Sequence, residues 1–267
     1  MHEPHHRPTG YRRSDILAWV SALSAGLWGL AAASSLLLGA AIAYWLEVPA
    51  RVTGLIMGFG AGTLLSAIAY ELIPDVPSRD DMLSIGLSLM AGALVYVVAD
   101  WLIDKRGGAA RSHVSGPGAG AGLTGAAHSI VLGTLLDGIP ESLVLGMGLA
   151  LGGEISVAYL IAVFLSNLPE AMAGTTGLLA SGDRPATVFG LWTGLAAASA
   201  AAAAIGYVIV TEMTTASGEM VQAFAAGATI VMLADAFLPQ AYEQGGRAAG
   251  FVTAVGFLVS LTLSGAA

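Results

Sequence analysis

The sequence predicts an all-α membrane protein with eight transmembrane helices. Of its 267 residues, 56% are hydrophobic and only 10% are charged, a balance that soluble domains do not have. The mean hydropathy is +0.77. Apolar runs of about 20 residues or more, enough to cross a hydrocarbon core, recur between short polar breaks. These observations together predict a chain that crosses a bilayer repeatedly.

The apolar runs divide the chain into one transmembrane domain, residues 16–267, preceded by a polar tail, residues 1–15. The predicted spans are 18–46, 52–74, 82–103, 122–151, 155–180, 186–210, 217–239 and 247–266. The first run is long for one crossing, so we expect a tilted helix or an interfacial portion. Residues 104–121, rich in Gly, Ala and Ser, are predicted to form a flexible loop.

Composition excludes several function classes. The chain has no cysteine, which excludes disulfides and thiolate metal ligands. Its net charge of −8 comes from scarce basic residues and from carboxylates inside apolar runs, which argues against nucleic acid as a partner. His2, His5 and His6 of the tail could bind a metal, but the tail composition favours a disordered, solvated segment. The expected surroundings are a lipid bilayer, and small-residue runs such as 196–204 would permit a homodimer.

Basic residues in the loops predict the orientation. One set of loops carries Arg51, then Lys105, Arg106 and Arg111, then Arg184 and Arg247, whereas the opposite loops carry Arg79. The positive-inside rule places the first set in the cytoplasm and both termini outside, although the arginines of the tail disagree. A single chain with short loops favours a prokaryotic cytoplasmic membrane.

Two hexapeptides in the fourth and fifth runs hold the candidate site. They are DGIPES at 137–142 and SNLPEA at 166–171, and each places a carboxylate beside a proline where charge is costly and a backbone hydrogen bond is lost. Asp137 and Glu141 are four residues apart and share a helix face, as do Ser166 and Glu170, with Asn167 three residues before Glu170. If the two helices are adjacent, these oxygen donors converge into a cation site.

The pattern has two alternative interpretations besides a cation site. A single buried glutamate beside a proline can be a helix-packing feature, but two matched copies favour a site. An intramembrane hydrolase would use a metal or paired glutamates, yet the chain has no His-Glu-x-x-His motif, no Gly-x-Ser-x-Gly elbow and no cysteine. The sequence therefore predicts a protein that is not an enzyme.

An internal repeat links the second and seventh runs. FGAG at 59–62 and FAAG at 224–227 are each followed by a proline twelve residues after the glycine. This order predicts two inverted halves around a central helix pair, a 3+2+3 arrangement that places a substrate at the pseudosymmetry axis. The same alignment matches Tyr70-Glu71 with Asp235-Ala236, so Glu71 and Asp235 are possible accessory ligands.

The hexapeptides resemble those of the ZIP (Zrt/Irt-like) family of divalent metal transporters, which carry His-Asn-x-Pro-Glu-Gly in the fourth span and x-x-x-Pro-Glu-Gly in the fifth. The eight spans and the variable loop after the third are also similar. The resemblance implies transport of zinc, iron or manganese towards the cytosol through a binuclear site between spans four and five. The metal is then the transported substrate, and no cofactor is expected.

The match to that family is not complete. Asp137 and Gly138 stand where the family has histidine and asparagine, and Asp235-Ala236 stands where a His-Glu pair is often found. The metal-ligand role that the resemblance implies is therefore assigned first to Glu141 and Glu170, and then to Asp137 and Asn167. The remaining candidates are Ser166, Asp235 and Glu71. One alternative is a ZIP-like protein that senses or binds metal without transport, and a mononuclear or a binuclear site both stay open.

The oxygen donors of the two hexapeptides indicate which metal ions the predicted site would favour. Carboxylate and amide oxygens favour harder cations such as Mn²⁺, while Zn²⁺, which often takes imidazole or thiolate, also accepts Asp and Glu. Mg²⁺ holds its waters tightly and fits a dry helix interface poorly. Protons compete with cations for carboxylates, so binding should weaken as the pH falls.

Overall fold

The apolar runs form helices because the hydrocarbon core offers backbone N–H and C=O groups no water, so each segment must satisfy them internally. The computed structural model describes residues 13–73, 79–103, 123–152, 155–213 and 215–264, and all regular structure in these ranges is helical. The helices are α1 (Arg13–Trp45), α2 (Ala50–Ala67), η1 (Ile68–Leu72), α3 (Arg79–Ile103), α4 (Leu123–Gly152), α5 (Val157–Ala180), α6 (Pro185–Thr211), α7 (Thr215–Met232), η3 (Leu233–Phe237), α8 (Leu238–Gly245) and α9 (Arg247–Ser264).

Eight segments within the described ranges are long and apolar enough to cross a membrane, which confirms the predicted number and a multi-pass membrane protein. The first run is one unbroken helix of 33 residues and contains no interruption. It begins at Arg13, inside the stretch assigned to the polar tail. The rest of the tail (residues 1–12) and the predicted loop 104–121 lie outside the described residues.

The seventh span is longer than predicted. We expected it to end at Pro239, but α7, η3 and α8 together form one candidate span, Gly218–Gly245. Pro239 lies in the first turn of α8. The missing N–H of a proline is tolerated in a first helical turn, so here the proline follows a π-helical turn and does not end the span.

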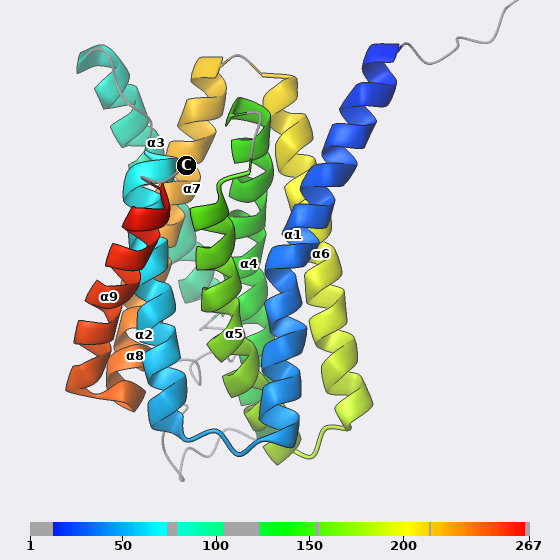
Figure 1. Ribbon diagram of the computed structural model, residues 1–267, viewed down its shortest axis with the longest axis vertical. Coiled ribbons are helices and arrows are strands. Elements are labelled where there is room, and N and C mark those ends of the chain that lie inside the picture. The colour runs from blue at the N-terminus through cyan, green and yellow to red at the C-terminus, as the bar shows by residue number, and fades with distance from the viewer. Residues whose placement is uncertain (1–12, 74–78, 104–122, 153–154, 214, 265–267) are drawn as a thin grey trace, which may run out of the picture.

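The helices form a bundle in which α4 and α5 lie inside and α3 and α9 lie outside (Figure 1). α1 packs against α5 and α6, and α4 packs against α6 and α5. α2 packs against α9, α5 and α8, while α3 packs mainly against α7. Only 17% of the α3 and α9 span windows is buried, against 50% for α4 and 56% for α5. The helices that carry the two hexapeptides are therefore shielded by their neighbours.

Glycines permit the closest helix crossings. A Cβ atom on Gly92 of α3 would collide with the carbonyl of Phe224 in α7, and one on Gly256 of α9 would collide with the carbonyl of Phe59 in α2. Small residues at such crossings let helix backbones approach in a membrane, where the hydrophobic effect does not drive helices together. Phe59 and Phe224 are the residues that open the two repeat sequences, so the α2–α9 and α3–α7 crossings use equivalent positions.

The repeat also appears in backbone geometry. η1 and η3 are five-residue π-helical turns, and each begins nine residues after the phenylalanine that opens its repeat. Turns of this kind are rare and are often found at functional sites. The two related spans therefore share an irregular turn at the same place, which the hydropathy pattern does not reveal.

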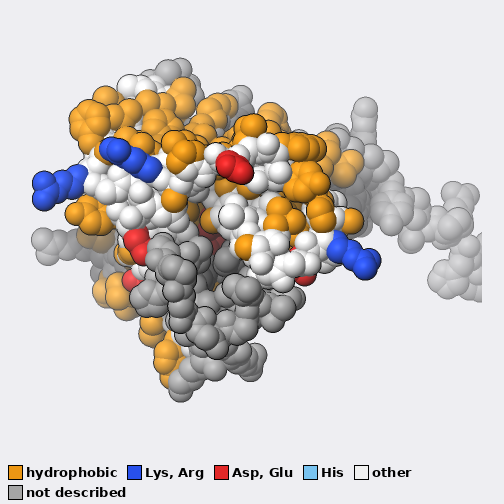
Figure 2. All heavy atoms as spheres, turned by 90° about the horizontal axis from the view of Figure 1, so that it is seen from below, with side chains coloured by type: hydrophobic (Ala, Val, Ile, Leu, Met, Phe, Trp, Pro, Cys, Tyr) orange, Lys and Arg blue, Asp and Glu red, His pale blue; other side chains and the backbone are white. Residues whose placement is uncertain are grey.

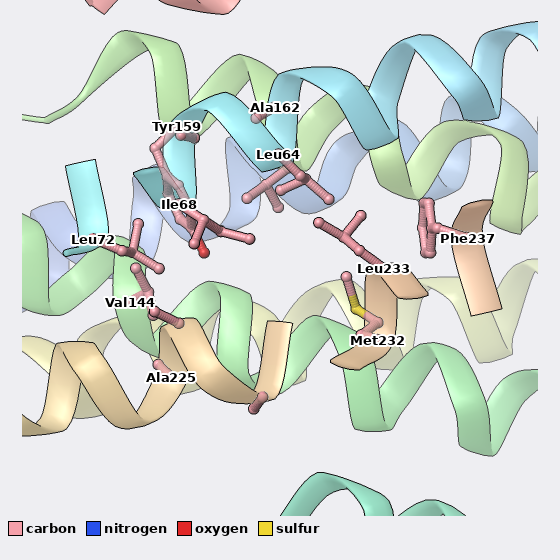
Figure 3. Close-up of a cluster of buried hydrophobic side chains, with 14 of the residues drawn as sticks. Leu64, Ile68, Leu72, Val144, Tyr159, Ala162, Ala225, Met232, Leu233 and Phe237 are labelled. Carbon is pink, nitrogen blue, oxygen red and sulfur yellow. The ribbon is translucent and has the colours of Figure 1, made fainter. Parts of the chain in front are cut away.

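Two apolar clusters hold the bundle together. The larger joins α2, α4, α5 and α7 with the π-helical turns, and its members include Leu64, Ile68, Leu72, Val144, Tyr159, Met232, Leu233 and Phe237 (Figure 3). The smaller joins α1, α5 and α6 around Trp192, whose indole N–H donates to Thr175 Oγ1 at 2.8 Å. Both clusters include residues of α5, so apolar packing holds this helix from two sides.

The described basic residues that are predicted to be cytoplasmic lie at one end of the bundle, whereas Arg13 and Arg79 are the first residues of α1 and α3. Arg51 and Arg247 lie in the first turns of α2 and α9, and Arg184 directly precedes α6. These three helices begin at the lower end in Figure 1, whereas α1 begins at the upper end. Figure 2 looks onto this lower end, where basic side chains project from the edge. The other predicted cytoplasmic basic residues (Lys105, Arg106 and Arg111) lie outside the described residues.

Candidate functional site

The two hexapeptides lie inside continuous helices. Pro140 is within α4 and Pro169 is within α5, so each helix lacks one backbone donor and leaves a carbonyl one turn earlier without its helical partner. For Pro169 that carbonyl belongs to Leu165. A Cβ atom on Gly60 of α2 would lie 3.1 Å from the Leu165 oxygen. This carbonyl therefore packs against the backbone of α2, where a larger side chain would not fit.

The α4 hexapeptide supplies two buried carboxylates. Asp137 is 3% exposed and Glu141 is 1% exposed. Within the described part of the chain, neither carboxylate oxygen of Glu141 has a hydrogen-bond partner. An unpartnered carboxylate costs several kcal/mol in such surroundings when it is charged, unless a cation lies beside it. Glu141 is thus the most unusual polar group of this helix.

The α5 hexapeptide adds neutral oxygen atoms and a third carboxylate. Ser166 and Asn167 are buried, and Glu170 is half-buried. The Ser166 hydroxyl donates to the Val163 carbonyl at 3.0 Å, so its proton is used within the helix while its oxygen keeps lone pairs. Since α4 and α5 pack against each other, the structure brings the two helices together as the sequence predicts.

Two tyrosines contact the α4 hexapeptide, and the sequence analysis missed both. Tyr96 of α3 donates its hydroxyl to Asp137 Oδ1 at 2.6 Å. Tyr159 of α5 donates to the backbone carbonyl of Glu141 at 3.3 Å. A tyrosine inside an apolar run is a signal in itself, because a buried phenol hydroxyl requires a partner, but only the fold identifies that partner.

The two accessory candidates are more exposed than the carboxylates of the α4 hexapeptide. Glu71 is half-buried in η1, and Asp235 is exposed in η3. Across the described residues, no group of three or more His, Cys, Asp or Glu side chains is arranged to hold a metal ion. The carboxylates of the hexapeptides therefore do not by themselves form a closed cluster, and any cation there would need amide, hydroxyl, backbone or water oxygens as well.

The sixth span contributes a residue that the sequence analysis did not consider. A Cβ atom on Gly138 would lie 3.7 Å from Ser199 Oγ of α6, which is an ordinary contact. The position has room for a Cβ atom, unlike Gly146 in the same helix, where a Cβ atom would collide with the carbonyl of Ala203. Ser199 is buried and adds a hydroxyl near the α4 hexapeptide.

No family model and no curated protein matches the chain. What the site can do follows from its own donors, which are carboxylates, an amide and hydroxyls within the membrane-spanning part of the bundle. Oxygen donors of this kind suit Mn²⁺ and similar cations and also accept Zn²⁺. A histidine or thiolate ligand is absent from both hexapeptides.

Proposed function

We propose that the chain transports divalent transition-metal cations, namely zinc, manganese or iron, across the membrane towards the cytosol. The observation that carries this proposal is Glu141, whose carboxylate is buried and has no hydrogen-bond partner among the described residues. Asp137 lies one turn away, and Asn167 and Glu170 are on the helix packed alongside. An intramembrane carboxylate in such a setting marks a cation or proton pathway more often than a packing contact.

Helix packing supports the inverted-repeat part of the proposal. Spans two and seven cross a membrane in opposite directions in an eight-span chain and share the equivalent turns η1 and η3. In an inverted repeat of this order, α1 corresponds to α6, α2 to α7, α3 to α9 and α4 to α5. The packed pair α1–α5 then corresponds to α6–α4, which is also packed. Likewise, the packed pair α2–α9 corresponds to the packed pair α7–α3. This correspondence is what a 3+2+3 arrangement predicts, with α4 and α5 at the axis.

The resemblance of both hexapeptides to ZIP transporters supports the same substrate class. The arginines at one end of the bundle support a cytoplasmic assignment for that end, with both termini outside. Inward transport would then deliver the cation from the end where α1 begins to the end that carries Arg51, Arg184 and Arg247. Movement of one helix group against the other is the expected mechanism for such repeats.

Metal flux into liposomes tests the proposal directly. Purified chain is reconstituted, Zn²⁺, Mn²⁺, Fe²⁺ or Cd²⁺ is added outside, and uptake is followed with a dye enclosed in the liposomes. Uptake above that of protein-free liposomes is expected for at least one of the four. Folded, inserted protein that moves none of them would contradict transport, and would favour a protein that senses or binds metal through the same site.

Cation binding is expected to depend on pH. A carboxylate must lose its proton to bind a metal, so protons compete with the cation and apparent affinity should rise between about pH 3.5 and pH 7.5. The measurement is the dissociation constant for Zn²⁺ and Mn²⁺ of the purified protein across this range. An affinity that stays constant over the whole range would contradict a carboxylate site.

Replacing Gly138 by asparagine is expected to strengthen Zn²⁺ binding. The position has room for a Cβ atom beside Ser199, and an asparagine there restores the amide that resembles the ZIP motif. The expected gain is about tenfold, measured as the change in the dissociation constant. Gly146→Asn, in the same helix, is the control that shows how a side chain at a crowded position affects the fold. It should lose thermal stability, because a side chain there collides with Ala203. A Gly138→Asn protein that unfolds like Gly146→Asn would contradict the open space at Gly138.

A further inference from the structure

The Asp137 carboxylate is bound from a helix outside the hexapeptide pair. Tyr96 of α3 donates its hydroxyl to Asp137 Oδ1 at 2.6 Å, and both side chains are buried, at 4% and 3% exposure. A short bond from a hydroxyl to a carboxylate is among the stronger hydrogen bonds, and the lack of surrounding water strengthens it further. α3 packs mainly against α7 and has few contacts with α4. Tyr96 thus links a peripheral helix to the candidate site.

We infer that Tyr96 is a positioning residue that orients the Asp137 carboxylate and restricts how that carboxylate binds a divalent cation. The inference rests on the proposed function, because Asp137 must bind the transported cation for its orientation to matter. Groups that hydrogen-bond to a metal ligand fix the orientation of that ligand, and their loss costs about 10- to 100-fold in metal affinity.

The hydrogen bond from Tyr96 to Asp137 also affects which cation the Asp137 carboxylate binds best. A carboxylate can bind a cation through one oxygen or through both, and a donor on Oδ1 disfavours the two-oxygen mode. Ca²⁺ takes six to eight oxygens and often uses both oxygens of a carboxylate, whereas Zn²⁺ takes about four ligands in total. Tyr96 should therefore favour Zn²⁺ over Ca²⁺ at Asp137, and its hydroxyl is a determinant of selectivity.

The Tyr96→Phe variant removes the hydroxyl and keeps the ring. We expect its affinity for Zn²⁺ to fall about 10- to 100-fold, while its affinity for Ca²⁺ stays unchanged or rises, so the Zn²⁺-to-Ca²⁺ affinity ratio drops about tenfold or more. Binding of radiolabelled Zn²⁺ to the purified full chain measures the first quantity, and displacement of that label by Ca²⁺ measures the second.

Tyr159→Phe is the matched control. Tyr159 is buried, and its hydroxyl also bonds to α4, but at the Glu141 backbone carbonyl and not at a carboxylate. This variant should leave the Zn²⁺-to-Ca²⁺ ratio within about threefold of native, a shift small beside the loss expected for Tyr96→Phe. If Tyr96→Phe retains the native ratio, or if both variants lose affinity for the two cations equally, the positioning role is wrong. A native chain that binds Mn²⁺ or Fe²⁺ but no Zn²⁺ overturns this inference alone. A native chain that binds none of the three overturns the proposed function, before any variant is compared.

A measurement on the native chain covers the case in which Tyr96→Phe does not fold. Infrared difference spectra with and without Zn²⁺, recorded on protein labelled with ring-deuterated tyrosine, should contain a tyrosine C–O band that shifts when the cation binds. A spectrum in which carboxylate bands shift and no tyrosine band moves would overturn the inference.

Discussion

Replacing Glu141 by glutamine is expected to abolish cation flux while leaving the protein folded. Glu141→Gln keeps the size of the side chain but removes its charge. Loss of a residue that merely supports a metal ligand costs 10- to 100-fold, so loss of a ligand itself should lower flux at least about 100-fold. Glu170→Gln is expected to act in the same direction, with a smaller loss because Glu170 is only half-buried.

Thermal stability distinguishes this result from misfolding. The Glu141 carboxylate has no hydrogen-bond partner among the described residues, so replacing it with a neutral amide of the same size breaks no hydrogen bond. The melting temperature of Glu141→Gln should therefore not be lower than that of the native chain. Glu243→Gln, at an exposed position of α8, is the control and should keep native flux. Native flux in Glu141→Gln would contradict a role of Glu141 in cation transport, on which the proposed function rests.

Adding one methyl group at Gly92 or Gly256 is expected to destabilise the bundle. In Gly92→Ala the new Cβ atom collides with the Phe224 carbonyl, and in Gly256→Ala it collides with the Phe59 carbonyl. Both obstacles are backbone atoms, which cannot move aside by a rotamer change. Overpacking of this kind costs about 1–3 kcal/mol, and the α3–α7 and α2–α9 crossings should separate at a lower temperature in detergent.

Each of these variants has a control six residues earlier in its own helix. A Cβ atom on Gly86 of α3 or Gly250 of α9 would meet nothing within 4 Å. Gly86→Ala and Gly250→Ala should be neutral or more stable by up to about 1 kcal/mol, since alanine favours a helix over glycine. Equal melting temperatures for Gly92→Ala and Gly86→Ala would contradict the close crossing of α3 and α7.

Local sequence features determined the number and place of the spans. Hydropathy depends on composition within a window, and a bilayer accepts only segments that satisfy their own backbone, so eight apolar runs predict eight helices. The two hexapeptides and the repeat could also be identified, because a proline or a carboxylate in an apolar run is conspicuous at any position. The structure adds that Asp137 and Glu141 are buried and that α4 packs on α5.

Only the tertiary structure decided which distant groups meet. Tyr96 and Asp137 are 41 positions apart, and no local pattern relates a tyrosine in one span to a carboxylate in the next. The same holds for Gly60 against the Leu165 carbonyl, for the space beside Gly138, and for the exposure of Asp235. The continuation of the seventh span beyond Pro239 depends on the turn η3, a change in helix winding that hydropathy does not record. Hydropathy and proline act within a single helix, whereas these contacts depend on the rotation and crossing of helices, which side chains from several spans set together.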